Sequence, residues 1–285
     1  MKNHAIPCLV TCLAKKLTVL TFLIFACAAF GQTPKLDALR QKAEQGDAEA
    51  QAQLGILYSH FGVSDPALKR DDAEAIKWIR KAAEQGNALG QNALGFMYAQ
   101  GREVDKNETE ALKWYKLAAA QGNPKAMLNL GITYAKGKDH SLQDIVDARE
   151  WFKKAFAIYK KLAGKGDEAG QFALGNMYRA GQGVTKDYAE ALKWFRKAAD
   201  QGSARAQIEL GYMYISGQGV PKDAAKGAQW WLKAAESGDD NGQLHAGRMY
   251  LNGNIVEQDN AKAKLWLEKS AAQGNKEAAV LLKSL

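Results

Sequence analysis

Few residues of this 285-residue chain combine the types and the spacing that catalysis or metal binding requires. Beyond residue 31 the histidines are His60, His140 and His245, which are far apart in the sequence. No His-Glu-x-x-His or Cys-x-x-Cys spacing is present to indicate a metal site. The chain also lacks the Gly-x-x-x-x-Gly-Lys loop that binds phosphates. We therefore predict no catalytic residue, no metal and no cofactor.

Six Asp or Asn residues each stand seven residues before a tryptophan, and in isolation their carboxylates could be taken for general acids or bases. The repetition favours a structural role, because an Asx side chain at a helix start accepts the free amide hydrogens of the first turn, typically for about 1 kcal/mol. Glu74, Glu110 and Glu190 follow three residues after such positions, as a capping box requires. The six predicted N-caps are Asp71, Asn107, Asp144, Asp187, Asp223 and Asp259.

These residues belong to a longer repeat. A Gly-x-x-Tyr, a loop, a tryptophan and a closing glycine recur six times, and four of the five intervals between closing glycines are 36 residues. Such a period is typical of a solenoid, in which one unit cannot bury its apolar face without its neighbours. The frame tyrosines are Tyr58, Tyr98, Tyr134, Tyr178, Tyr214 and Tyr250; the frame tryptophans are Trp78, Trp114, Trp151, Trp194, Trp230 and Trp266; the closing glycines are Gly86, Gly122, Gly166, Gly202, Gly238 and Gly274.

Each repeat is predicted to be a helix, a turn and a second helix. In the repeat that ends at Gly202, residues 171–178 have apolar side chains at helical spacing, and Gly181 and Gly183 then stop the helix. Residues 188–201 carry a second apolar stripe at helical spacing, which includes Trp194 and Phe195. The fold class is therefore predicted to be all-α, an α-α solenoid of six helix-turn-helix repeats with flanking half-repeats. We place the repeats at approximately 47–86, 87–122, 123–166, 167–202, 203–238 and 239–274, and a C-terminal capping helix at 275–285.

The first helix of every repeat contains a glycine, which costs about 1 kcal/mol in helix propensity relative to alanine. We expect the missing side chain to let the second helix come close, so that the indole of the frame tryptophan fills the space between the two helices. These glycines are Gly55, Gly95, Gly131, Gly175, Gly211 and Gly247.

Two repeats depart from the pattern. The first has a longer loop that contains Ser64, Asp65 and Pro66, which we interpret as a local surface feature. In the third repeat, the interval from Trp151 to Gly166 is almost twice the interval between the corresponding residues of the other repeats. The seven extra residues are almost two helical turns, so we expect a longer second helix with Phe156, Tyr159 and Leu162 on its buried face and a bend in the array.

Residues 1–31 are predicted to be a secretory signal peptide, with residues 32–285 forming the solenoid. Lys15 and Lys16 precede an uncharged apolar run at 17–30 that is short for a membrane core requiring about 20 residues. Cleavage is expected before Gln32, or after Ala29, which would leave no stable membrane span. An uncleaved N-terminal anchor is the alternative. The predicted location is the periplasm, with secretion or an outer-membrane lipoprotein as alternatives.

All three cysteines lie within this leader, so the predicted mature chain has no disulfide or thiolate chemistry. Residues 23–27 loosely resemble a lipoprotein cleavage box, and processing there would place a lipid anchor at Cys27. The formal net charge is +8, but basic and acidic residues share the same helix faces, as in residues 193–197. Mixed charge together with export argues against nucleic-acid binding.

One frame unites the repeats: Ala-x-x-x-Leu-Gly-x-x-Tyr, Gly-x-Gly-Val-x-x-Asp and Ala-x-x-Trp-x-x-x-Ala-Ala-x-x-Gly. The segment from Ala206 to Gly238 shows it, with Gly227 in place of one alanine. This frame resembles the Sel1-like repeat, a relative of the tetratricopeptide repeat, over essentially all of the chain after the leader. The resemblance implies a right-handed α-α superhelix whose concave surface is lined mainly by first helices. It also implies roles of exported bacterial members as adaptors in envelope signalling, in assembly of secreted polymers or in contact with host cells.

Function is expected where the repeat varies. In the first helices, the positions three before the internal glycine, one after it and four after it differ between repeats and share one helix face. Ile56, Ile132 and Ile208 are interpreted as core between repeats. Aromatic and arginine side chains are common interface anchors. The candidate partner-binding residues are Phe96, Asn176, Arg179, Tyr212 and Arg248.

The leading hypothesis is a non-enzymatic exported scaffold that binds a protein or peptide in the concave groove. Cysteine-rich relatives of the repeat are linked to β-lactam binding and weak hydrolysis, which gives an alternative hypothesis of a cell-wall or β-lactam binder or hydrolase. The chain lacks the pairing cysteines of that group and the Ser-x-x-Lys of serine acylating enzymes. A second alternative is a lipid-anchored envelope adaptor.

Overall fold

The computed structural model describes residues 33–59, 71–136 and 141–285. The leader, His60, His140 and the insertion at 64–66 lie outside these described residues. The chain divides into two compact units, Met1–Leu94 and Gly95–Leu285.

The described part of the first unit is a short row of helices. These are α2 (Thr33–Glu44), α3 (Ala48–Ser59), α4 (Asp72–Glu84) and the start of α5 (Ala88–Gln100), which continues into the second unit. Ala43, Ala50 and Leu54 form its buried core, with Trp78 packed against them. The half-repeat expected before the first full repeat is therefore present as α2.

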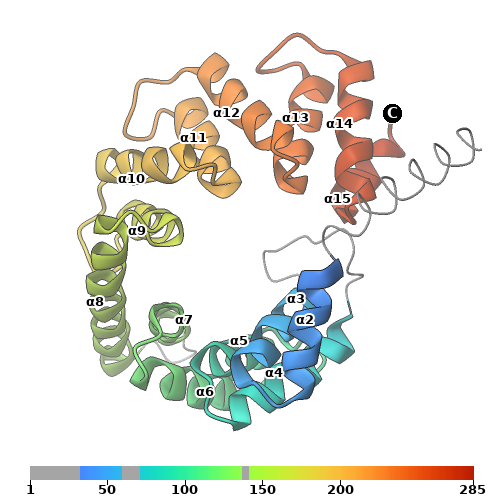
Figure 1. Cartoon of the computed structure of the whole chain (residues 1–285). Helices are drawn as coiled ribbons and strands as arrows, with labels where there is room; N and C mark the ends of the chain where they lie inside the picture. Colours follow the sequence, from blue (N-terminus) through green and yellow to red (C-terminus); the bar gives the residue numbers. More distant parts are fainter. Residues whose placement is uncertain (1–32, 60–70, 137–140) are drawn as a thin grey trace, which may run out of the picture. The chain divides into compact units, whose positions relative to one another are not determined.

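The second unit continues the alternation of first and second helices. First helices α7, α9, α11 and α13 form one layer, and second helices α6, α8, α10, α12 and α14 form the other (Figure 1). The predicted all-α solenoid of helix pairs is confirmed, since the described residues contain helices and no strand. The helices are α6 (Glu108–Ala120), α7 (Pro124–Ala135), α8 (Leu142–Gly164), α9 (Glu168–Ala180), α10 (Tyr188–Asp200), α11 (Ala204–Ser216), α12 (Ala224–Glu236), α13 (Asp240–Asn252), α14 (Asn260–Ala272) and α15 (Lys276–Leu282).

The glycine within each first helix lies against the residue that follows the frame tryptophan. Gly175, for example, lies against the ring of Phe195, and a Cβ added to the glycine would clash with that ring. The expectation that the frame tryptophan fills this space is therefore wrong by one residue, or about 100° around the helix. The six contacts are Gly55–Ile79, Gly95–Tyr115, Gly131–Phe152, Gly175–Phe195, Gly211–Trp231 and Gly247–Leu267.

The frame tryptophans are instead half-buried, and lysine side chains cover them. Lys197 Nζ lies 4.5 Å from the ring centroid of Trp194, and Lys269 Nζ lies 4.4 Å from that of Trp266. Such cation–π contacts are each worth about 0.5–1 kcal/mol at exposed sites. The indoles therefore form part of the outer surface of the second helices, where the lysines shield them from water.

Five of the six predicted N-caps are confirmed. The exception is Asp144: α8 begins three residues earlier than expected, with Ser141 as its N-cap, and Ser141 Oγ accepts the Asp144 amide hydrogen at 3.0 Å. The helix starts earlier because a second residue able to cap is available at Ser141. The confirmed caps are Asp71, Asn107, Asp187, Asp223 and Asp259.

In a capping box, the glutamate three residues after the N-cap accepts the backbone amide hydrogen of the N-cap residue. Here a carbonyl oxygen of the first helix accepts that hydrogen instead. The backbone amide of Asp187 donates to the carbonyl oxygen of Tyr178 at 2.9 Å, and the same bond joins the other confirmed caps to their frame tyrosines. Glu190 pairs with Lys193, three residues further on, at 2.8 Å. Each Asx residue thus both caps the second helix and closes the loop that leads to it.

Buried glutamines connect neighbouring repeats. Gln171 Nε2 donates to the carbonyl oxygen of Ala163, and Gln171 Oε1 accepts from Gln201 Nε2 at 2.7 Å. Gln243 makes the same two contacts with Ala235 and Gln273. A buried amide that is hydrogen-bonded at both ends fixes the spacing between helix pairs.

The lengthened second helix of the third repeat is confirmed as α8, which has 23 residues where α10 has 13. Tyr159 is buried, as expected, but Phe156 and Leu162 are only partly buried. The extra residues repeat a seven-residue pattern, because Phe152 follows Trp151 as Phe195 follows Trp194, while Tyr159 stands seven residues before Gly166 as Phe195 does before Gly202. Two residues of α8, Phe152 and Tyr159, therefore correspond to the single Phe195 of an ordinary repeat.

Candidate binding site

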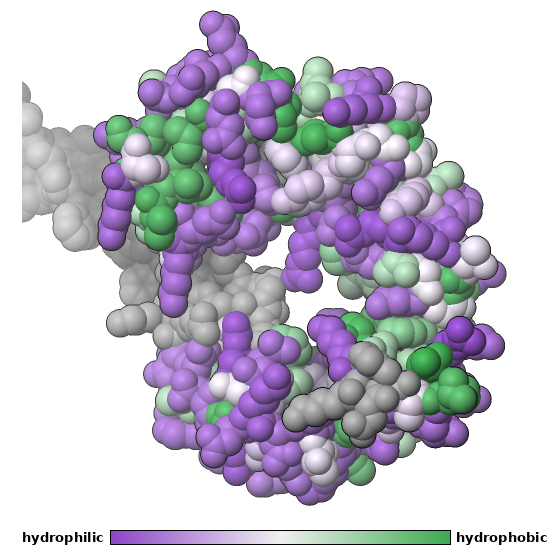
Figure 2. All heavy atoms as spheres, turned by 180° about the vertical axis from the view of Figure 1, so that it is seen from behind, coloured by the Kyte–Doolittle hydropathy of each residue, from purple (hydrophilic) through white to green (hydrophobic). Residues whose placement is uncertain are grey.

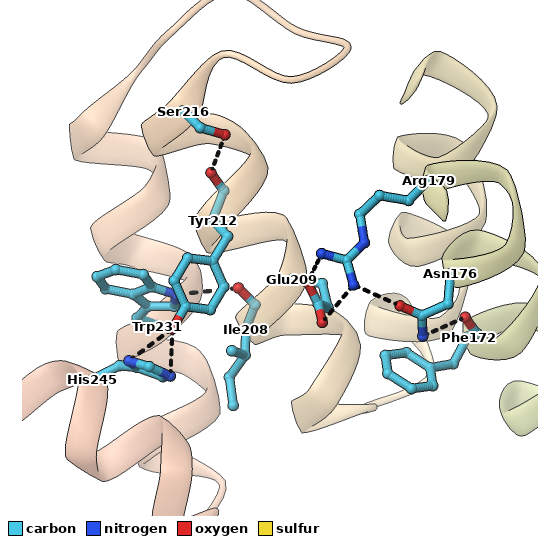
Figure 3. A network of polar contacts seen from close by, with 9 residues as sticks. All are labelled: Phe172, Asn176, Arg179, Ile208, Glu209, Tyr212, Ser216, Trp231 and His245. Atoms are coloured by element: carbon cyan, nitrogen blue, oxygen red, sulfur yellow. Dashed lines mark hydrogen bonds and ion pairs between the residues drawn. The ribbon is translucent and has the colours of Figure 1, made fainter. Parts of the chain in front are cut away.

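The five predicted contact residues all lie on first helices of the second unit. Phe96 is on α5, Asn176 and Arg179 are on α9, Tyr212 is on α11 and Arg248 is on α13. Figure 3 shows Asn176, Arg179 and Tyr212 with their contacts within α9 and to the neighbouring helices. Phe96 is half-buried, and it is not part of the network drawn there.

An ion pair links α9 to α11. Arg179 Nη1 lies 3.3 Å from Glu209 Oε2, and Arg179 Nη2 donates to Asn176 Oδ1 at 3.0 Å (Figure 3). Asn176 also donates to the carbonyl oxygen of Phe172. Burial raises the pKa of the Glu209 carboxyl, and the guanidinium of Arg179 partly offsets this rise. The two predicted residues on α9 therefore form one unit held by a carboxylate from the next repeat.

Three aromatic rings link α11, α12 and α13. Tyr212 Oη lies 3.1 Å from His245 Nε2, and the rings of Trp231 and His245 are stacked with centroids 5.0 Å apart (Figure 3). Tyr212 meets both rings edge-on. Trp231 Nε1 donates to the carbonyl oxygen of Ile208 at 3.1 Å. These contacts hold Tyr212 in place while 45% of its surface stays exposed.

His245 is neutral at physiological pH. Burial, reinforced by the nearby Arg248 guanidinium, lowers the pKa of His245 from its usual 6.5 to about 4. A neutral imidazole can both donate and accept one hydrogen bond, so its contact with the Tyr212 hydroxyl is possible with either partner as donor. The histidine therefore acts in this structure as a packed neighbour of Tyr212.

A second ion pair continues the row from α13 to α15. Arg248 Nη1 lies 2.8 Å from Glu277 Oε1, and both side chains are about half exposed. The row thus runs through three links between successive first helices: Arg179–Glu209, Tyr212–His245 and Arg248–Glu277. We call the surface formed by these six residues the linked row.

The second member of each link was not among the predicted contact residues. Glu209 and His245 stand two residues before their internal glycines, a position that also varies between repeats and could have been included. Glu277 lies in the C-terminal half-repeat, where no internal glycine marks the position. A contact between side chains of two successive repeats leaves no recognisable pattern among neighbouring residues of the sequence.

The described residues were also compared with the requirements of a metal site and of a membrane span. In the described ranges, no group of three or more His, Cys, Asp or Glu side chains could hold a metal ion. None of the helices between residue 33 and the C-terminus that the structure describes has the length and apolar content to cross a bilayer. Hydrophilic side chains cover most of the face in Figure 2, and hydrophobic residues occur there in small separate groups.

The Sel1 repeat family model matches this chain six times. The matched residues are 48–87, 88–123, 124–157, 169–203, 204–239 and 241–275. Most copies adjoin one another, but residues 158–168 are unmatched between the third and fourth, within and just after the extra turns of α8. The match covers well over half of the chain.

Several solved structures are similar to this chain. A Sel1 repeat protein from Oxalobacter formigenes is 28% identical over 86% of this chain and 95% of its own, with a TM-score of 0.53. The immunity protein Pa5087 from Pseudomonas aeruginosa shares the fold at 17% identity, a TM-score of 0.52, and coverage of 80% of this chain and 83% of its own. A protective antigen of uropathogenic Escherichia coli is 40% identical over 87% of this chain, with a TM-score of 0.45, and the chain spans only 50% of that protein.

A search among curated proteins finds no match. Proteins built from Sel1 repeats are typically non-catalytic scaffolds for protein–protein interaction. The six matches, the helix pairs and the glycine-centred packing together show that this chain belongs to the Sel1 repeat family.

Proposed function

We propose that this protein is a non-enzymatic scaffold that binds a protein or peptide partner along the linked row of α9, α11 and α13. The observation that carries the proposal is the state of Tyr212, which is 45% exposed yet held by contacts with Trp231 and His245. Rigid aromatic side chains lose little entropy on binding, so an exposed ring that is already fixed suits an interface.

The neighbouring charges support the same use. Arg248 and Glu277 leave about half of each side chain exposed, and Arg179 leaves 38% exposed beside its partly buried partner Glu209. Exposed ion pairs contribute little to stability, typically about 0–1 kcal/mol. Such pairs can instead exchange partners with charged groups of a ligand, which gives register and specificity.

Export is the second part of the proposal. Residues 1–31 would direct the chain to the bacterial envelope, with the periplasm as its location and adaptor roles in envelope signalling or host contact as its setting. The basic start and the short apolar run at 17–30 support this. N-terminal mass spectrometry of the native protein tests it: a start at Gln32 agrees, a lipidated Cys27 indicates an anchored form, and an intact leader contradicts export by cleavage.

Affinity capture from native envelope extract tests partner binding. The triple variant Arg179→Ala, Tyr212→Ala, Arg248→Ala, which changes three residues of the linked row, should lose a partner that the parent chain retains, and the isolated partner should then bind the parent with measurable Kd. A matched control on the second-helix layer is Leu117→Ala, Leu265→Ala, Lys264→Ala, since all three side chains are exposed. Equal capture by the triple variant would move the site away from the linked row.

A further inference from the structure

The duplicated heptad of α8 changes the register between the third and fourth repeats. In an ordinary pair, Gly219 of the following loop lies against the carbonyl of Tyr188, near the start of the second helix that leads to closing Gly202. Gly183 lies in the same way against the carbonyl of Phe152, which is as far before its own closing glycine, Gly166, as Tyr188 is before Gly202. The fourth repeat is therefore aligned with the C-terminal end of α8.

The third repeat is aligned with the other copy of the heptad. Gly131 of α7 lies against Phe152, the residue that follows Trp151. In the fourth repeat, Phe195 serves both neighbours, because it meets Gly175 of α9 and packs with Leu210 and Met213 of α11. In α8, Phe152 meets Gly131 of α7, whereas Tyr159 stands at the same distance before its closing glycine as Phe195 does. The seven extra residues displace α9 along α8 by about 10 Å.

A cavity of about 510 Å³ lies beside the extra turns of α8 and is lined by residues of both α7 and α9. Tyr159, from the extra turns of α8, lines it together with Leu128 of α7 and Phe172 and Met177 of α9. Gln182 of the loop after α9, the start of α11 and Asp239 at the start of α13 also line it. A cavity of this volume, with apolar side chains and a few polar groups at its edge, has the dimensions of a ligand site.

The charged side chains at the edge of the cavity differ in how well their surroundings stabilise them. Glu168 lies in the first turn of α9, where the helix dipole favours an acid, and Asp239 caps α13 and interacts with the charge of Arg205. Lys125 is also in a first turn, that of α7, where a cation is disfavoured. Lys125 is exposed and has no ion-pair partner among the described residues.

We propose that this cavity binds a large apolar side chain of a partner peptide, and that Lys125 binds an acidic residue next to it. The proposal rests on the proposed function, because it assumes a peptide along the first-helix layer, and it specifies that peptide as apolar and acidic. Asn176 joins the two sites, since it lines the cavity and also accepts from Arg179 in the linked row.

Methionine methyl groups provide a direct measurement. Met177 lines the cavity, while Met213 and Met249 occupy the equivalent buried positions in the next two repeats. The chain labelled with ¹³C in its methionine methyl groups would be titrated with acetyl-Glu-Phe-Glu-amide, and Met177→Leu would assign the signal. We expect a saturable shift of the Met177 signal, with the Met213 and Met249 signals unchanged.

Two peptides and three variants separate the parts of the proposal. Acetyl-Glu-Gly-Glu-amide lacks the apolar side chain, and acetyl-Lys-Phe-Lys-amide reverses the charge, so both should bind at least about fivefold more weakly. Lys125→Glu should weaken acetyl-Glu-Phe-Glu-amide by about fivefold, and Lys116→Glu on α6 should not. Ala169→Leu fills the cavity from an exposed position and should abolish the shift, with the Met213 signal reporting an intact fold.

Equal binding of the acidic and basic peptides would overturn the role of Lys125. A Met177 shift that persists in Ala169→Leu, or no saturable shift in the parent chain, would overturn the cavity as the site. Either result leaves the proposed function standing if partner capture still depends on Tyr212 and Arg248. Conversely, capture that ignores the linked row would remove the proposed function without altering the Met177 measurement.

Discussion

The hydroxyl of Tyr212 lies 3.1 Å from Nε2 of His245, in the next helix pair. This contact places an ionisable group inside the boundary between two repeats, where burial lowers the pKa of His245 to about 4. The unfolded chain has the ordinary pKa of 6.5, so below that pH the unfolded state binds more protons than the folded state. Stability from this group is therefore complete above pH 6.5 and is lost as pH falls toward 4.

We expect the free energy of unfolding to fall by about 1–2 kcal/mol between pH 7 and pH 5 because of His245. His245→Gln keeps a polar group near Tyr212 but does not titrate, so its free energy of unfolding should fall less over the same interval. Urea unfolding of both chains at the two pH values measures the difference. Equal losses in the two chains would show that other groups cause the pH dependence.

Gly211→Ala should destabilise the protein by about 2 kcal/mol, although alanine has the higher helix propensity. The new methyl group would meet the indole of Trp231, and forcing extra atoms into a packed core typically costs about 1–3 kcal/mol. Gly164→Ala is the matched control, since Gly164 ends α8 with no atom in the way of a Cβ. That change should be neutral or stabilising by up to about 1 kcal/mol in thermal or urea unfolding. Similar losses in both variants would contradict the contact.

The packing of Gly211 also shows which features of the fold can be predicted from the sequence and which cannot. The period and five of the caps were predictable, because they depend on residue types a few positions apart. Whether the frame tryptophan or the residue after it packs against the glycine was not predictable. The rotation of the second helix about its axis decides this, and that rotation depends on both neighbouring helices. The links of Glu209 and His245 join helices of successive repeats, and no local pattern specifies such a pairing.

The two candidate caps of α8 give a direct comparison. Ser141→Ala should cost about 1 kcal/mol, because it removes the side chain that accepts the Asp144 amide hydrogen. Asp187→Ala should cost a similar amount at the start of α10, where Asp187 Oδ1 accepts from Glu190. Asp144→Ala should cost clearly less, as Asp144 lies inside the first turn. Unfolding by urea measures all three, and a larger loss at Asp144 than at Ser141 would restore Asp144 as the cap.

Gln207 is the exception among the buried glutamines of the repeat. Its Nε2 donates to the Ala199 carbonyl, but its Oε1 is buried and has no hydrogen-bond partner in the described residues. Gln201 and Gln273 supply that partner to Gln171 and Gln243, whereas Ser237 stands at the corresponding position after Gln207. Ser237→Gln should therefore raise the free energy of unfolding by about 0.5–1 kcal/mol.

Ser237→Ala controls for the loss of the serine itself, whose hydroxyl donates to the Ala234 carbonyl in its own helix. The gain from Ser237→Gln should disappear when Gln207→Leu is added, because the acceptor is then absent. A gain that is unchanged in the Gln207→Leu background would assign it to helix propensity instead.

Deletion of residues 153–159 removes one copy of the α8 heptad and joins Phe152 to Lys160. The resulting run, Trp-Phe-Lys-Lys-Leu-Ala-Gly-Lys-Gly, matches the spacing of residues 194–202. A single phenylalanine would then serve both neighbours, as Phe195 does, and α9 would return to the ordinary register with α7. We expect one cooperative unfolding transition and no response of Met177 to acetyl-Glu-Phe-Glu-amide. Tyr159→Phe keeps both the heptad and the ring, so it should retain the response. Retention of the response by the deletion variant would show that the duplicated heptad does not create the cavity, and loss of cooperative unfolding would show that it is required for the fold.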